Sequence, residues 1–209
     1  MDQLQPKHLD TSRGFRYTYY FSQPKADDAK PAILLCHGWP DSAHLWKEIV
    51  DHILKSKQRL IIPDLLVCGG SSRPTDPIDF EIGAMVADVM QVIQAEKIEQ
   101  NIIPMGHDWS GSYFVTRFYL FNSARMAGLV TFNVALQPAR SEPFGLAIAN
   151  SMTEKAFGCP LYAYWELFAD PKGPGEIMTK NPQSVCHAMH GASNDWRKTI
   201  FCLPGAIRE

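Results

Sequence analysis

Three short runs rich in apolar residues constrain the fold of this chain more than any other feature. They are residues 32–36, 59–64 and 101–105, and apolar positions follow one another in them without polar alternation. A strand that is apolar on both faces must be covered on both faces, as in a parallel sheet. Helical patterns at 42–54 and 80–98 separate the runs. Strands that alternate with helices predict an α/β fold with a mostly parallel sheet.

The pattern changes after about residue 136. Before it, we expect an early strand at 16–21, an apolar helix at 113–121 and a further strand at 128–134. After it, prolines and glycines break the chain up to Pro160, and short helices are expected from residue 161 onward. The domain prediction is therefore an α/β core at 1–136 and a helical segment at 137–209.

Composition excludes several classes of function. The 209 residues carry a formal net charge of −2, which argues against a nucleic-acid partner. No stretch approaches the roughly 20 apolar residues that a membrane span needs. The start lacks a signal-peptide pattern and the last four residues are no peroxisomal signal, so a cytoplasmic location is expected. Five cysteines without a C-x-x-C pair predict neither disulfides nor a metal site.

The hexapeptide Gly106-His107-Asp108-Trp109-Ser110-Gly111 lies between a predicted strand and a predicted helix. A nucleophile on a tight strand-to-helix turn needs small neighbours, because a bulky side chain would clash there. Gly106, Ser110 and Gly111 stand at the required spacing around Asp108. A carboxylate nucleophile would attack carbon and form an alkyl ester. An ordinary βα loop with an exposed Asp is the plainer alternative.

Two other segments support the chemical interpretation. His37-Gly38-Trp39-Pro40 follows the preceding buried strand, and the backbone N–H groups of Trp39 and Trp109 are candidate oxyanion-hole donors. The segment 162–171 is rich in aromatic residues. Such residues usually pack in cores, but a Tyr hydroxyl could donate a proton to an opening epoxide.

These motifs together resemble the epoxide-hydrolase branch of the α/β-hydrolase fold. The resemblance runs from about Phe15 to the end and includes Pro63-Asp64-Leu65-Leu66 with Gly69-Gly70. It implies Asp108 as nucleophile, Trp39 and Trp109 as oxyanion donors, and Tyr164, rather than Tyr162, as a lid proton donor. Residues 137–209 would be an incomplete helical lid. It implies a small-molecule epoxide substrate and no cofactor.

The chain departs from the family pattern at two places. Val67 and Cys68 precede Gly69-Gly70 where the family usually continues with glycine, so Val67 is expected to strain that loop. The family's general-base His and its orienting acid follow the lid, and this chain ends inside lid-like sequence. The resemblance therefore implies a C-terminal truncation. Asn133 occupies the strand end that holds an acid in some related hydrolases. We expect a trapped ester and no useful turnover.

Other functions remain open from the sequence. A haloalkane dehalogenase uses the same Asp-Trp elbow, although it often has Asn where Trp39 stands. A serine esterase is disfavoured because Ser110 lies two residues past the nucleophile position. The chain could also be a truncated, non-catalytic remnant, and a role in a secondary-metabolite pathway is compatible with any of these. The sequence does not specify the substrate or the oligomeric state.

Overall fold

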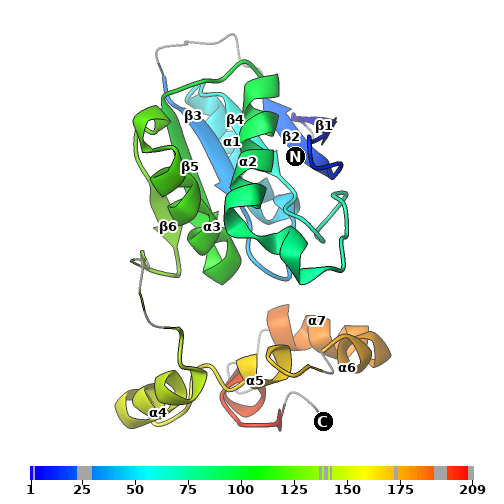
Figure 1. Ribbon diagram of the computed structural model, residues 1–209, viewed down its shortest axis with the longest axis vertical. Coiled ribbons are helices and arrows are strands. Elements are labelled where there is room, and N and C mark those ends of the chain that lie inside the picture. Colours follow the sequence, from blue (N-terminus) through cyan, green and yellow to red (C-terminus); the bar gives the residue numbers. More distant parts are fainter. Residues whose placement is uncertain are drawn as a thin grey trace. The chain divides into compact units, whose positions relative to one another are not determined.

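A six-stranded sheet with the order β1-β2-β4-β3-β5-β6 organises the first part of the chain (Figure 1). The pairs β3–β4, β3–β5 and β5–β6 are parallel, whereas β1–β2 and β2–β4 are antiparallel. The predicted α/β fold with a mostly parallel sheet is confirmed. The strands are β1 (Gln5–Asp10), β2 (Arg16–Ser22), β3 (Ala32–Cys36), β4 (Leu60–Pro63), β5 (Ile102–His107) and β6 (Val130–Phe132).

The computed structural model divides into two compact units, Met1–Pro138 and Ala139–Glu209. Within the described residues, no helix has the length and apolar character needed to cross a membrane. The structure describes residues 1, 3–22, 30–136, 138, 141, 143–171, 174–190 and 197–206.

Helices cover both faces of the sheet in the first unit. On one face, α2 and α3 pack over Leu34 and Ile61, and on the other face η1 and α1 pack over Ile33 and Leu35. Neighbouring residues of β3 therefore enter opposite cores, which explains its continuous apolar sequence. The helices are η1 (Ala43–Trp46), α1 (Lys47–Lys55), η2 (Pro77–Phe80), α2 (Ile82–Ala95), α3 (Asp108–Phe121) and η3 (Ser123–Arg125).

Strand β1 is absent from the sequence prediction. It pairs with β2 from Gln5↔Phe21 to Asp10↔Arg16 at one edge of the sheet. Its side chains are mainly polar and exposed or half-buried. A polar edge strand carries no apolar signal, and polar side chains protect a sheet edge from further pairing. The strand is therefore recognisable only from its partner.

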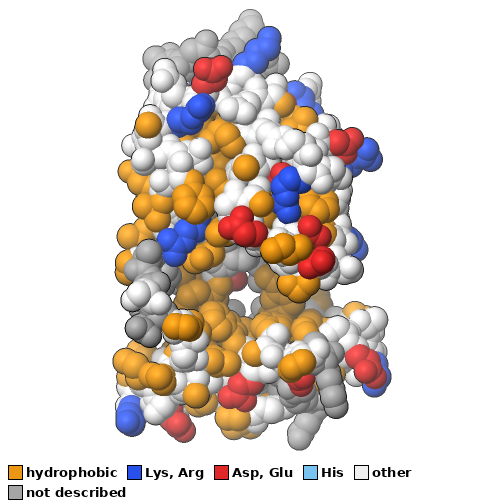
Figure 2. Space-filling model, in the orientation of Figure 1, with side chains coloured by type: hydrophobic (Ala, Val, Ile, Leu, Met, Phe, Trp, Pro, Cys, Tyr) orange, Lys and Arg blue, Asp and Glu red, His pale blue; other side chains and the backbone are white. Residues whose placement is uncertain are grey.

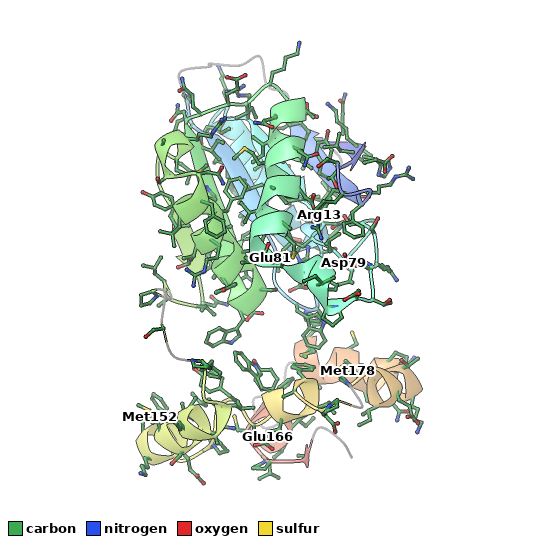
Figure 3. All side chains as sticks on the ribbon, viewed as in Figure 1. Arg13, Asp79, Glu81, Met152, Glu166 and Met178 are labelled. Atoms are coloured by element: carbon green, nitrogen blue, oxygen red, sulfur yellow. The ribbon has the colours of Figure 1, made fainter. Side chains whose placement is uncertain are left out.

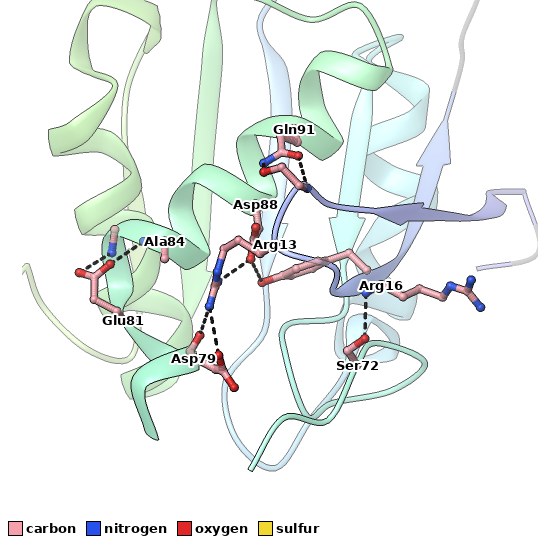
Figure 4. A network of polar contacts seen from close by, with 11 residues as sticks. Arg13, Arg16, Ser72, Asp79, Glu81, Ala84, Asp88 and Gln91 are labelled. Atoms are coloured by element: carbon pink, nitrogen blue, oxygen red, sulfur yellow. Dashed lines mark hydrogen bonds and ion pairs between the residues drawn. The ribbon is translucent and has the colours of Figure 1, made fainter. Parts of the chain in front are cut away.

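A buried ion pair attaches the β1–β2 turn to α2. The Arg13 guanidinium lies 2.7 Å from the carboxylate of Asp88 and also donates to the carbonyl oxygen of Asp79 (Figure 4). The hydroxyl of Tyr17 donates to the same Asp88 carboxylate. Glu81 caps the start of α2 by accepting from the backbone N–H groups of Gly83 and Ala84. The N-terminal hairpin is thus fixed to the helix that follows η2.

The second unit consists of short helices, and one of them contradicts the sequence prediction. Helix α4 (Leu146–Phe157) forms where prolines and glycines are expected to break the chain. Gly145 immediately precedes this helix and Gly158 follows it. Gly158 ends the helix with a left-handed conformation, φ +79°. Helix α7 begins at Pro182, where the fixed φ of proline suits the first turn of a helix. The remaining elements are α5 (Trp165–Phe168), α6 (Gly175–Lys180), α7 (Pro182–His190) and the π-helical turn η4 (Arg197–Phe201).

Asn150 of α4 organises the interior of the second unit. Its side chain is buried, and its Oδ1 accepts from the backbone N–H of Tyr162 at 2.9 Å.

Figure 3 labels Met152 on α4, Glu166 on α5 and Met178 on α6. Met152 is 66% exposed, and Figure 2 shows hydrophobic side chains at the surface of this unit.

Candidate active site

Asp108 is the first residue of α3 and follows β5 directly. Its φ is +60°, a left-handed conformation that is uncommon outside glycine. The helix therefore begins five residues before the predicted start at Tyr113, with no loop between strand and helix. A Cβ on Gly106 would overlap the carbonyl oxygen of Gly111, and a Cβ on Gly111 would stand 2.6 Å from that of Cys36. Glycine at both positions makes the tight turn possible.

The Asp108 carboxylate is half-buried and accepts a hydrogen bond from the backbone N–H of Trp109. Burial raises the pKa of this carboxyl, and the Trp109 N–H and neighbouring His107 partly oppose that shift. A half-buried carboxylate is less well solvated than one in bulk water. It is therefore a better nucleophile than a carboxylate in water, provided that it is ionised.

The turn after β3 lies directly against this elbow. A Cβ on Gly38 would stand 2.6 Å from the Cβ of Asp108 and 2.9 Å from its Oδ2. Trp39 follows, is 38% exposed, and is joined to Pro40 by a cis peptide bond. The structure thus brings together the His37–Pro40 segment and Asp108, which lie about 70 positions apart in the sequence.

His37 holds the two neighbouring turns together. Its buried Nε2 accepts a hydrogen bond from the backbone N–H of Leu65 at 3.0 Å. The proton must then be on Nδ1, which donates to the carbonyl oxygen of Gly38 at 2.8 Å. Burial lowers the pKa of His37, which favours this neutral form. The His37 side chain therefore links the backbone at Gly38 to the backbone at Leu65.

Asp64 is a structural residue of this region to which the sequence pattern alone assigns no role. Its carboxylate is buried and accepts from the backbone N–H groups of Ala43 and Gly70, at 2.8 and 3.0 Å. A Cβ on Gly69 would overlap that carboxylate. In the sequence, this role is indicated by an Asp that is followed a few residues later by Gly69-Gly70. Glycine has no Cβ, so the backbone can approach the Asp64 carboxylate closely enough to donate hydrogen bonds to it.

His107 is engaged on the side of β6. Its Nε2 lies 2.9 Å from the amide nitrogen of Asn133, which follows β6 and has φ +67°. The amide nitrogen donates, so Nδ1 carries the ring proton, and among the described residues that buried atom has no hydrogen-bond partner. The ring also meets Trp46 edge to face. The amide of Asn133 thus stands beside the residue that precedes Asp108.

A pocket of about 310 Å³ opens beside the elbow within the first unit. Among the described residues that line it, none is Asp, Glu, Lys or Arg. Trp39 and Ser110 connect it to the elbow. Val67 has φ +65°, as expected for a residue that strains this loop. The lining residues are His37, Trp39, Leu65, Leu66, Val67, Cys68, Phe80, Ile82, Met85, Ser110, Tyr113 and Phe114.

Tyr164 belongs to the second unit and immediately precedes α5. Its ring meets those of Trp165, Phe168 and Phe201 edge to face, and its backbone N–H donates to the carbonyl oxygen of Phe201. The aromatic density of 162–171 therefore builds a packed cluster around Tyr164.

Neither a metal-ligand cluster nor a disulfide bond is found among the described residues. Within the described ranges, no three His, Cys, Asp or Glu side chains gather in a group that could hold a metal ion. All five cysteines are free.

Comparison with known proteins places this geometry in a family. Residues 31–155 match the model of the alpha/beta hydrolase fold family. Bifunctional epoxide hydrolase 2 of Rattus norvegicus is 24% identical over 165 residues, which are 79% of this chain and 28% of the relative. An epoxide hydrolase of Caballeronia sordidicola is 33% identical over 85 residues, 41% of this chain and 26% of the relative. The chain thus spans less than a third of the length of these two relatives.

Solved structures show the same fold. An epoxide hydrolase from an endophytic Streptomyces superposes with a TM-score of 0.78 at 19% identity, over 100% of this chain and 62% of that one. Epoxide Hydrolase A from Mycobacterium thermoresistibile gives 0.74 at 21% identity, over 98% and 62%. The matched model covers more than half of the residues, and the elbow lies inside it. The chain belongs to the α/β-hydrolase-fold family, and the relatives that it resembles are epoxide hydrolases.

Proposed function

We propose that Asp108 opens a small-molecule epoxide by nucleophilic attack and forms a hydroxyalkyl ester. The observation that carries the proposal is the position of Asp108 at a left-handed strand-to-helix turn with its carboxylate on the Trp109 N–H. The similarity to epoxide hydrolases supports the choice of substrate class.

In the first step, a carboxylate oxygen of Asp108 bonds to an epoxide carbon while the ring carbon–oxygen bond breaks. The ring oxygen takes the electron pair and needs a proton. We propose that residues 137–209 are a lid segment and that the hydroxyl of Tyr164 supplies this proton. General acid help of this kind typically contributes 10²–10⁴-fold in rate.

In the second step, water attacks the ester carbonyl, and negative charge develops on the acyl oxygen. The backbone N–H groups of Trp39 and Trp109 are the proposed donors for that charge. The contact of Gly38 with the Oδ2 side of Asp108 supports this placement, because it brings the Trp39 turn to the carboxylate. Collapse of the intermediate releases a vicinal diol and restores the Asp108 carboxylate.

The second step also needs a base to activate water. His37 Nε2 is occupied by Leu65 N–H, and His107 Nε2 by the Asn133 amide. Because these two rings are already engaged, we propose that the ester accumulates on the 209-residue chain.

Mass spectrometry of the intact chain after incubation with styrene oxide tests this proposal. The expected result is a mass increase of one epoxide, located on Asp108 by peptide mapping and abolished in Asp108→Asn. Tyr164→Phe should slow labelling by about 10²-fold. Equal labelling of Asp108→Asn, or labelling of Cys68 instead, would contradict the assignment. Several molecules of diol per chain would contradict accumulation of the ester.

A further inference from the structure

We propose that Val67 is a specificity-determining residue, which sets the size of the apolar group that the pocket beside the elbow accepts. This inference rests on the proposed function, because the pocket reaches the elbow through Trp39 and Ser110. The resembled family usually has glycine at this position, so a valine wall would be a feature of this chain.

The backbone of Val67 is strained. Its φ of +65° lies in the left-handed region, where a β-branched residue is an outlier. Such strain persists only when the surrounding structure determines the conformation, and it tends to occur at functional sites. Glycine would adopt this φ without strain. The presence of a branched side chain here therefore requires an explanation.

Hydrogen bonds on both sides of Val67 prevent the loop from relaxing. The N–H of Val67 donates to the carbonyl oxygen of Ser72 at 2.9 Å, and the N–H of Cys68 donates to that of Leu65 at 3.0 Å. Ser72 is in turn paired with Arg16 of β2, whose N–H donates to the Ser72 hydroxyl (Figure 4). These backbone hydrogen bonds fix the direction of the Val67 Cα–Cβ bond.

Val67 is one of the residues that line the pocket, and it is 43% exposed. Phe80, Met85 and Tyr113 also line this pocket of about 310 Å³. Such a surface favours hydrocarbon or aryl groups. Val67 is stiff at its χ1 bond, so its two methyl groups form a wall that does not yield as Met85 would.

Two substitutions at Val67 distinguish the effect of side-chain size from the effect of backbone strain. Val67→Gly removes both the wall and the strain, whereas Val67→Ala keeps the strained φ and removes two methyl groups. Lys97→Gly is the matched control, because Lys97 is exposed and has φ +57°. It follows the far end of α2, roughly 20 Å along that helix from Ile82.

The probes are n-alkyl amides of increasing chain length, which bind through the alkyl group and cannot alkylate Asp108. Affinity for the wild-type chain, measured by titration calorimetry, should rise about fourfold per methylene until the pocket is full. In Val67→Gly the rise should continue for about two more methylenes, since the removed isopropyl group leaves that space. Val67→Ala should show a smaller extension.

Lys97→Gly should give the wild-type limit, while both glycine variants raise Tm by about 2–4 °C through relief of strain. An unchanged length limit in Val67→Gly, or an equal shift in Lys97→Gly, would overturn the inference. The same titrations in Asp108→Asn keep the two proposals apart. Failure to alkylate Asp108 together with a shifted limit counts against the proposed reaction alone.

Discussion

The α-carbon of Gly38 lies so close to Asp108 that a methyl group on it would stand 2.6 Å from the Asp108 Cβ. The same methyl would stand 2.8 Å from the carbonyl oxygen of His107. Both neighbours belong to the elbow's backbone or to the first atom of its side chain. Neither can move without moving the turn itself.

Gly38→Ala should therefore displace the elbow. We expect a loss of about 1–3 kcal/mol in the free energy of unfolding. We also expect about 10²-fold slower ester formation, because misplacement of reacting groups by about 1 Å has this effect. Urea unfolding and the mass-spectrometric labelling rate measure the two changes. Gly128→Ala is the control, since a Cβ there meets nothing within 4 Å. Similar behaviour of the two variants would contradict the prediction.

Asp108→Asn should stabilise the fold at neutral pH. Burial raises the pKa of Asp108, so the folded state holds the ionised form less well than the unfolded state does. Asparagine is neutral and also tolerates positive φ better than most residues. We expect a higher free energy of unfolding for Asp108→Asn than for the wild type at pH 7.

The gain should shrink as the pH falls through the raised pKa of Asp108, because the wild-type carboxyl then becomes neutral as well. Urea unfolding of both proteins at pH 7 and at about pH 4 measures this trend. Ester formation by the wild type should fall over the same range as the nucleophile is protonated. A stability gain that grows on acidification would reverse the sign and disprove the argument.

Asp64→Asn should loosen the loop that carries Val67. The amide can accept only one of the two backbone hydrogen bonds that the carboxylate accepts from Ala43 and Gly70. A buried N–H group left without a partner costs about 1–3 kcal/mol. Urea unfolding measures the loss, and Glu99→Gln, an exposed change of the same chemistry, should alter stability by less than about 0.5 kcal/mol. Equal stability of the two variants would contradict this role.

Arg13→Met should destabilise the chain far more than Arg16→Met. Arg13 pairs with the fully buried Asp88, whereas Arg16 and Asp10 form an exposed pair. Removing the cation from a buried pair costs about 3–5 kcal/mol, whereas an exposed pair is screened by solvent and contributes little. Thermal or urea unfolding of the two variants gives the comparison.

Adding Asp88→Asn to Arg13→Met should recover part of the loss, since the remaining buried group is then neutral. If Arg13→Met alone is as stable as wild type, the pair does not hold the N-terminal hairpin on α2.

The apolar runs and the glycine spacing around Asp108 are sufficient to predict the sheet type and the strand-to-helix turn. Both depend on local rules: side-chain alternation for covered strands, and absence of a Cβ where backbones meet. The strained backbone of Val67 is expected from the family resemblance, because the family usually has glycine at that position. In contrast, β1 escapes prediction since it is polar, and α4 since flanking glycines bound a helix as readily as they break one.

The contacts that give these motifs a possible chemistry come from tertiary structure. Gly38, Asp64 and Asn133 stand in separate segments of the sequence. The fold brings Gly38 against Asp108, Asp64 against Ala43 and Gly70, and Asn133 against His107. The sequence by itself determined which backbones have to be tight and which strands have to be buried. Only the parallel sheet, which carries its loops to one edge, decided which of those loops meet and how far the carboxylate of Asp108 is removed from water.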